Sequence, residues 1–168
     1  MPASVSRGPA GTRIAVNSAA PQFLMGAFAR RVTAPTKLRI VNVSSGAAHS
    51  AYPGLGDYCA TKAALRIAGQ TLAEEFALEG RTPDQAAVLS YEPGLVETRM
   101  QVAARDTTPE RFPGHETFRG FQSQGLLVEP TEVVGLLEDI GASRAEGALL
   151  KLGSLRYARK RGRPECSM

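Results

Sequence analysis

Residues 38–62 read LRIVNVSSGAAHSAYPGLGDYCATK, and this stretch decides the fold. Its first six residues are largely apolar and rich in β-branched side chains, which is typical of a buried strand. Small residues and Pro53 follow, and they predict a loop over 44–56. From Tyr58 to Leu78 apolar residues recur at helical spacing, and Gly80 supplies a helix stop. The stretch therefore predicts a strand that leads through a loop into a long helix.

The sequence on either side continues the alternation of helices and strands. Apolar residues at helical spacing predict a helix over 14–32, in which Pro21 predicts a late start or a kink. After the central helix we expect, in order, a strand over 86–91, an irregular stretch over 97–125, a helix from Pro130 to about Ile140 and a strand over 147–152. Strands separated by helices indicate an α/β fold with about three parallel strands and flanking helices.

Composition indicates one domain with polar ends. The hydrophobic fraction of 43% is sufficient for a packed core. We expect a flexible tail over 1–12, a domain over 13–155 and a basic tail over 156–168. The net charge of +4 is unevenly distributed, and solvated basic ends are its plainest interpretation.

The cysteines and the apolar runs indicate the cellular compartment in which we expect the protein. Cys59 and Cys166 do not make a disulfide framework, and no Cys/His cluster has the spacing of metal ligands. No apolar run reaches the ~18 residues of a membrane helix. We therefore expect a cytoplasmic protein without a metal site or a membrane span.

Tyr58 and Lys62 form the first chemical signal. Because they are four residues apart at the start of the long helix, they lie on one of its faces. An ordinary phenol has a pKa near ~10, and a neighbouring ammonium favours the ionised form. Such a pair can give a proton to a carbonyl or take one from an alcohol, although an exposed tyrosine beside a solvated lysine would also fit.

Further polar groups follow the two central strands. Ser45 comes after the first strand, and the turn Pro93-Gly94-Leu-Val-Glu-Thr98 comes after the second. Parallel α/β sheets bind ligands at the carboxyl ends of their strands. A serine there can donate a hydrogen bond to a carbonyl oxygen. The plainer interpretations are a capped loop and an ordinary turn.

In order and spacing, four elements resemble the catalytic half of the short-chain dehydrogenases/reductases. They are VNVSS, the thirteen residues from Ser45 to Tyr58, Tyr-x-x-x-Lys, and PGxxxT after the next strand. The resemblance covers about residues 13–155 and implies a partial Rossmann-like, doubly wound fold. It also implies NAD(P)H-dependent reduction of a ketone or diketone, with Tyr58 as proton donor to a small-molecule carbonyl substrate that Ser45 binds and polarises.

The same resemblance assigns the cofactor contacts. Lys62 would ease the loss of the Tyr58 proton and, with Tyr58, hold the nicotinamide ribose. Asn17, 28 residues before Ser45, resembles the family's catalytic asparagine, which holds a water that relays protons to the lysine. Pro93, Gly94 and Thr98 match the loop that touches the nicotinamide carboxamide.

A closer resemblance is to the sepiapterin reductase and benzil reductase branch. It is carried by YCATKAA, VLSYEPGLVETRMQ and FQSQGLLVEP, and it implies NADP as cofactor, with NAD left open. In sepiapterin reductases an Asp after GKLV binds the pterin. Here Glu129 follows the run GLLV, which makes it a candidate substrate ligand. Alternatively, Glu129 is a charge that favours the N-terminus of the helix expected at Pro130.

The family's glycine-rich turn does not occur in these 168 residues. Neither G-x-x-x-G-x-G nor G-x-G-x-x-G is present, and Gly54-Leu-Gly56 lacks a third glycine. Since the family binds the cofactor pyrophosphate at that turn, we expect the N-terminal dinucleotide-binding half to be absent and this chain by itself to be inactive. The strand over 38–43 would then be an edge with unpaired backbone groups.

Two other functions stay open. The chain could be a non-catalytic fragment that pairs with a full-length homologue, because the helices over 14–32 and 58–79 match the family's dimer interface. The same match implies a homodimer. The tail segment Arg159-Lys-Arg-Gly-Arg-Pro164 contains RGRP, the core of segments that bind the DNA minor groove. A plain basic tail is the favoured interpretation, so we do not expect nucleic acid as a partner.

Overall fold

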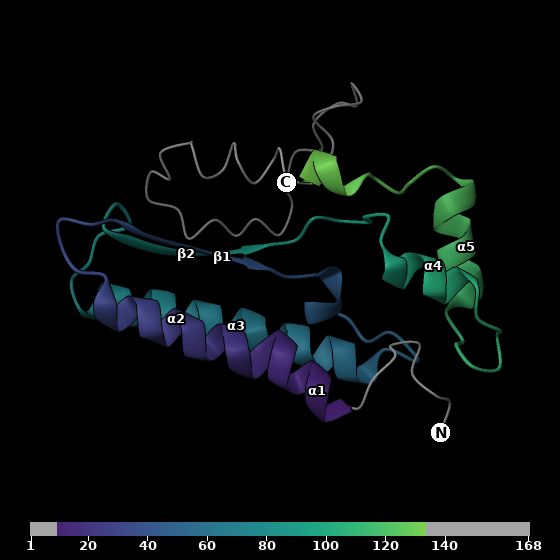
Figure 1. Cartoon of the computed structure of the whole chain (residues 1–168), viewed down its shortest axis with the longest axis horizontal. Helices are drawn as coiled ribbons and strands as arrows, with labels where there is room; N and C mark the ends of the chain where they lie inside the picture. Colours follow the sequence, from purple (N-terminus) through teal and green to yellow (C-terminus); the bar gives the residue numbers. More distant parts are fainter. Residues whose placement is uncertain (1–9, 134–168) are drawn as a thin grey trace.

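The computed structural model describes residues 10–133, which form a two-stranded parallel sheet with helices packed on it (Figure 1). The strands are β1 (Leu38–Val43) and β2 (Ala86–Tyr91), and both have the bounds that the sequence predicted. Leu38 pairs with Ala86 and Val43 pairs with Tyr91, so the strands match over their full length. The α/β class is confirmed.

Helix α3 (Gly56–Leu78) connects the two strands and completes a βαβ unit. It begins two residues before Tyr58, after a loop that contains a short 3-10 turn at Gly46–Ala48. It ends just before Gly80, whose φ of +73° is left-handed and therefore suits glycine. The predicted helix and its stop are both present.

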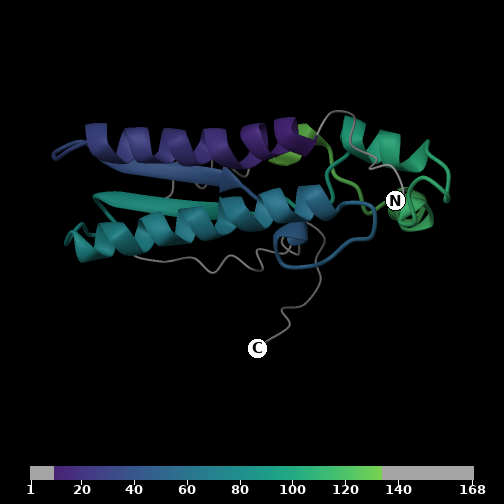
Figure 2. The ribbon, with the colours of Figure 1, turned by 90° about the horizontal axis from the view of Figure 1, so that it is seen from below.

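The N-terminal helix lies beside α3 on the same face of the sheet, as Figure 2 shows. It consists of α1 (Ala10–Ile14), a π-helical segment (Ala15–Ala19) and α2 (Ala20–Arg31). Of the two alternatives expected at Pro21, a late start or a kink, the late start is wrong, because the helix already begins at Ala10. Pro21 lies in the first turn of α2, directly after the π-helical segment, and has no backbone N–H to donate to the preceding turn.

The core lies between these two helices and the sheet. Asn42 of β1 is buried in it, and its amide contacts the sulfur of Met25 at 3.1 Å. Gly69 lets α3 approach the strand closely, since a Cβ there would lie 2.8 Å from Nδ2 of Asn42. The buried apolar residues of this cluster are Met25, Leu38, Leu65, Leu72, Phe76 and Ala86.

Both helices also carry apolar side chains that face away from this core. On α3 the side chain of Ile67 is exposed, although it belongs to the apolar face that the sequence indicated. On the N-terminal helix the exposed apolar residues include Val16, Phe23, Leu24 and Phe28. Burial of the core therefore accounts for only part of the apolar periodicity in these two helices.

The stretch 97–125 is not irregular, as the sequence suggested, but contains two short helices. They are α4 (Arg99–Arg105) and α5 (His115–Ser123). The Thr98 side chain caps α4 by accepting a hydrogen bond from the backbone N–H of Gln101 at 3.4 Å. Both helices lie beyond the ends of the strands (Figure 1). The prolines that argued against helix lie between α4 and α5.

Several expectations fall outside the described part of the chain. These are the strand over 147–152 and the basic tail with its RGRP segment, together with most of the tail over 1–12. The helix expected at Pro130 is present over 130–133, where the described residues end. Within residues 10–133, no helix has the length and hydropathy needed to cross a membrane.

Candidate active site

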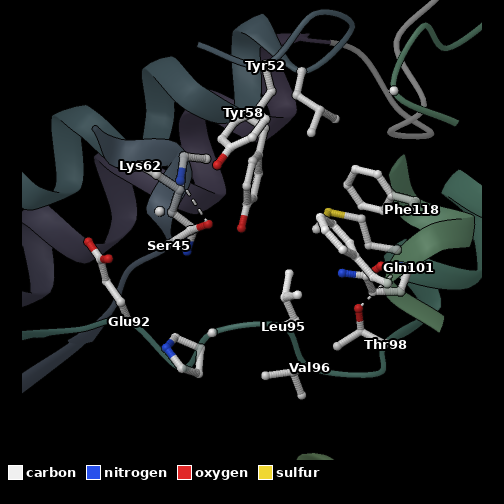
Figure 3. A pocket seen from close by; sticks show the side chains of 18 of the residues that line it. Ser45, Tyr52, Tyr58, Lys62, Glu92, Leu95, Val96, Thr98, Gln101 and Phe118 are labelled. Atoms are coloured by element: carbon white, nitrogen blue, oxygen red, sulfur yellow. Dashed lines mark hydrogen bonds between the residues drawn. The ribbon is translucent and has the colours of Figure 1, made fainter. Parts of the chain in front are cut away.

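A cavity of about 980 Å³ opens beyond the carboxyl ends of β1 and β2. One wall comes from the loop after β1 and the start of α3. The other comes from α4 and α5, as Figure 3 shows, and the loop after β2 joins the two. This is the edge of a parallel sheet at which ligands bind. The fold therefore creates a pocket where the sequence placed its polar groups.

Ser45, Tyr58 and Lys62 all line this pocket and share one wall of it (Figure 3). Ser45 directly precedes the short 3-10 turn, and its Oγ accepts a hydrogen bond from the backbone N–H of Ala47 at 3.2 Å. Because a hydroxyl both accepts and donates, its proton stays available for a ligand. Tyr58 lies in the first turn of α3, whose position is set by packing against the sheet.

Lys62 lies one helical turn after Tyr58 and is half-buried. Its Nζ donates a hydrogen bond to the carbonyl oxygen of Val43 at 2.7 Å and lies 5.8 Å from the centroid of the Tyr58 ring. Burial lowers the pKa of Lys62 from its ordinary value of 10.5, because desolvation disfavours the ammonium. An ammonium has three N–H donors, so two remain for a ligand.

Asn17 lies near this group but does not line the pocket. It is in the π-helical segment, and its Nδ2 donates to Oγ1 of Thr61 at 3.4 Å. Thr61 stands between Tyr58 and Lys62 on α3, and its hydroxyl donates to the Tyr58 carbonyl oxygen at 2.9 Å. Asn17 therefore contacts α3 in the turn that carries the tyrosine and the lysine. The π segment is consistent with a functional position, since such segments occur often at functional sites.

Pro93, Gly94 and Thr98 line the pocket from the loop after β2. Gly94 has a φ of +81°, and a Cβ added there would meet no atom within 4 Å. The backbone is thus open toward a ligand at this point. Glu97, next to Thr98, forms a two-pronged ion pair with Arg105 at 2.7 and 3.0 Å, which fixes the loop to α4.

Glu129 is exposed and is not among the residues that line the cavity. Its neighbour Val128 does line it, because Val128 forms a parallel bridge with Val96 of the β2 loop. The structure therefore brings the GLLV run to the pocket but leaves the carboxylate after it outside the lining. Successive residues of an extended segment point to opposite sides, which accounts for this separation.

Sequence reasoning missed the wall that α4 and α5 supply. Phe118 and Phe121 are one helical turn apart on α5, with ring centroids separated by 5.6 Å. The Phe112 ring meets that of Phe118 edge-on at 5.3 Å. All three line the pocket, together with Gln101 of α4. The i, i+3 spacing of the two α5 phenylalanines was the available signal, but the prolines nearby concealed it.

A second missed feature joins the two loops at the strand ends. His49, after the Ser45 turn, lies 2.5 Å from Glu92, measured from Nε2 to Oε1. Glu92 lines the pocket directly before Pro93. The pair links the loop that carries the serine to the loop that carries the PG turn. Sequence reasoning had no signal for it, because the two residues are 43 positions apart.

Residues 9–109 match the family described as short chain dehydrogenase. The chain belongs to this family. The matched part of this chain covers the N-terminal helix, both strands, α3 and α4. The pocket residues Ser45, Tyr58 and Lys62 all lie inside it.

Comparison with individual proteins shows more specifically what this chain is similar to. A benzil reductase that forms (S)-benzoin, from Bacillus cereus, is 32% identical over 131 residues, which is 77% of this chain and 51% of that protein. A diacetyl reductase that forms (S)-acetoin, from Staphylococcus epidermidis, is 30% identical over 81% of this chain and 50% of its own length. The crystal structure of the KRED1-Pglu enzyme matches with a TM-score of 0.53 and 26% identity, over 66% of this chain and 42% of that one. The chain spans about half the length of the curated relatives it matches.

Proposed function

We propose that this short-chain dehydrogenase takes part in NAD(P)H-dependent reduction of a ketone, and specifically of a 1,2-diketone. The observation that carries the proposal is the presence of Ser45, Tyr58 and Lys62 on one wall of a large pocket at the strand ends. Benzil and diacetyl, named in the relatives' descriptions, are both 1,2-diketones. The likeness to these two relatives supports a 1,2-diketone as the proposed substrate class.

In the proposed reaction each polar group has a separate task. The Ser45 hydroxyl donates a hydrogen bond to the carbonyl oxygen and so polarises the carbonyl. Tyr58 gives its proton to the same oxygen. Lys62 favours the tyrosinate left behind, because a cation next to a phenolate stabilises it. Asn17 would hold a water that returns a proton toward Lys62, on the α3 turn that its amide contacts. Glu129 does not line the described cavity, so it would have to move toward the cavity to bind the substrate.

The described residues fit the nicotinamide end of a cofactor. Lys62 has two free donors for ribose hydroxyls, and the open backbone at Gly94 lies in the same pocket, with Pro93 and Thr98 beside it. When bound, the nicotinamide supplies the hydride that adds to the carbonyl carbon. The phosphate end has no counterpart, since these 168 residues contain no glycine-rich turn before a helix. We propose NADP, and NAD would use the same nicotinamide contacts.

The experiment measures NADPH oxidation with benzil and with diacetyl. We would assay the chain as it stands, and also the chain fused to the N-terminal half of the Bacillus cereus benzil reductase, called the completed chain below. We expect diketone reduction by the completed chain. Tyr58→Phe should lower it by about 10²–10⁴-fold while NADPH binding is kept, because the phenol transfers the proton. A completed chain that binds NADPH but reduces neither diketone would contradict the proposal.

The second candidate function is a non-catalytic fragment that pairs with a homologue or with itself. The observation in its favour is the exposure of Phe23 and Phe28 on α2 and of Ile67 on α3. We propose that these two helices form the dimer surface. Cofactor affinity separates the two functions, because an interaction fragment needs no NADPH.

A further inference from the structure

Gln101 is a buried polar residue in the apolar wall of the pocket. It is 5% exposed, and its Oε1 has no hydrogen-bond donor among the described residues. Leaving a buried acceptor unpaired costs about 1–3 kcal/mol. Buried polar groups are therefore nearly always satisfied, so in a pocket wall such an atom takes its partner from outside the protein, either water or a ligand.

The position of Gln101 suits a ligand that spans the pocket. Figure 3 shows it on α4, across the cavity from Ser45 and Tyr58, and near Phe118. The other polar lining residues of this wall are Thr98, whose Oγ1 accepts from the Gln101 backbone, and Thr117, which is exposed. Gln101 is thus the buried amide that faces the carbonyl-binding wall. Its terminal torsion is broad, so the amide can turn its oxygen toward a bound molecule.

The surroundings of Gln101 indicate a flat, aromatic ligand. Phe118 and Phe121 pack on each other at 5.6 Å and line the same wall. Aromatic side chains bind aromatic rings through offset or edge-to-face contacts. A ligand ring against this wall would bring a substituent at its far end to the amide.

Building on the proposed function, we propose that Gln101 binds a hydrogen-bond donor on the far ring of an aromatic ketone or diketone. A phenolic hydroxyl fits best, because it donates to Oε1 and can also accept from Nε2. The substrate class is then a hydroxylated aryl diketone rather than a small aliphatic one. The carbonyl lies at Ser45 and Tyr58, and the hydroxyl lies at Gln101.

A purely structural role for Gln101 predicts a different outcome. If the amide only filled space, an apolar side chain of similar shape would leave every ligand preference unchanged. For the free protein, replacing an unsatisfied polar group by an apolar one of similar shape is close to neutral or stabilising. Stability and ligand preference therefore separate the two roles.

The test measures ligand binding without cofactor on the 168-residue chain. We would titrate 4,4′-dihydroxybenzil and 4,4′-dimethylbenzil, which have similar size and differ in the donor, against the parent chain and Gln101→Met. The control is Gln122→Met, an exposed glutamine on α5 outside the pocket lining. We expect the parent and the control to prefer the dihydroxy compound by about two- to tenfold. Gln101→Met should abolish that preference without lowering the thermal midpoint.

Three results would overturn the inference. The first is an equal preference in the parent chain and in Gln101→Met, and the second is no binding of either compound. The third is a lowered midpoint in Gln101→Met with parallel loss of both ligands, which would make the residue structural. The titration needs no NADPH and no turnover. An inactive completed chain would therefore contradict the proposed function and leave the measured ligand preference unaffected.

Discussion

Burial of Lys62 disfavours the charged form that its proposed role in the reaction requires. Desolvation lowers the pKa of this lysine from 10.5, whereas its proposed task requires the charged ammonium. As pH rises through the lowered pKa, the ammonium loses its proton and its support for the tyrosinate. We therefore expect diketone reduction by the completed chain to decline with rising pH before pH 10.5 is reached. The measurement is kcat/KM as a function of pH.

Lys62→Arg is the matched variant for this pH profile. A guanidinium keeps its charge over the whole accessible range, so the decline should move to higher pH. The overall rate should also fall, because the planar group cannot reproduce the contact to Val43. If the decline stays at the same pH in Lys62→Arg, another group is responsible for it.

Because Gly54 has no side chain, the Phe112 ring from the opposite wall of the pocket can pack against it. Its φ of +84° is left-handed, and a Cβ there would lie 2.6 Å from Cδ2 of Phe112. Phe112 is almost fully buried, with Leu55 and Ala104 in the same cluster. We expect Gly54→Ala to lower the free energy of unfolding by about 2–4 kcal/mol, because backbone strain and overpacking add.

Gly80→Ala is the control for Gly54→Ala. Gly80 also has a positive φ, of +73°, but a Cβ there meets nothing within 4 Å. This variant should show the backbone strain alone, at about 1–2 kcal/mol. Urea unfolding of both variants measures the difference. Equal losses would mean that Phe112 moves aside freely and does not hold the walls together.

At the scale of elements, α4 and α5 show why short helices are hard to predict from sequence. Neither has the length to be stable by itself. Helix α4 depends on the Thr98 cap and the Glu97–Arg105 ion pair, and α5 depends on the packing of Phe118 against Phe112. These contacts are local and form no long apolar repeat, and both helices also pack in one cluster with Leu55, which directly precedes α3. Periodicity within 97–125 therefore did not reveal the two helices. The strands and α3 were predictable because their apolar patterns are long and regular.

The paired helices α2 and α3 lead to a prediction about association. Phe23 is 70% exposed and Ile67 is 54% exposed, which is a large amount of apolar surface to leave in water. We expect the chain to self-associate through these helices and the double variant Phe23→Glu, Ile67→Glu to be monomeric. Sedimentation over a range of concentrations measures the change.

Gln122→Glu on α5 is the control for this double variant. Its side chain is exposed and polar and lies outside α2 and α3, so an added charge there should leave association unchanged. Circular dichroism checks that both proteins keep their helices. A double variant that is folded and still self-associates would place the contact on another surface, such as the β1 edge.

At the scale of the whole molecule, this chain contributes only part of the proposed cofactor site. The residues proposed to contact the nicotinamide line one pocket, whereas these 168 residues contain no glycine-rich turn for the pyrophosphate. Most of the positioning energy of a dinucleotide, which can reach ~7–11 kcal/mol in catalysis, then has no source. We expect this chain by itself to bind NADPH more weakly than micromolar and to show no diketone turnover.

Calorimetric titration with NADPH checks this expectation, with the completed chain as the positive control. Micromolar affinity of the unfused chain would show that the nicotinamide end contributes more than we assign to it. Turnover that Tyr58→Phe abolishes would lead to the same conclusion. The resemblance to the family would stand in either case, since it rests on residues 9–109.

The sequence by itself determined the βαβ unit, the helix before it, and the grouping of Ser45, Tyr58 and Lys62 that lines one wall of the pocket. Apolar runs and helical spacing are local properties, and the interval from Ser45 to Tyr58 follows from a loop of fixed length between a strand and a helix. Only the tertiary structure decided the opposite wall, with Phe112, Phe118 and Gln101, and it left Glu129 outside the lining. The reason is physical: which residues of α4 and α5 face the pocket depends on how those helices pack, and packing partners lie far apart in the chain.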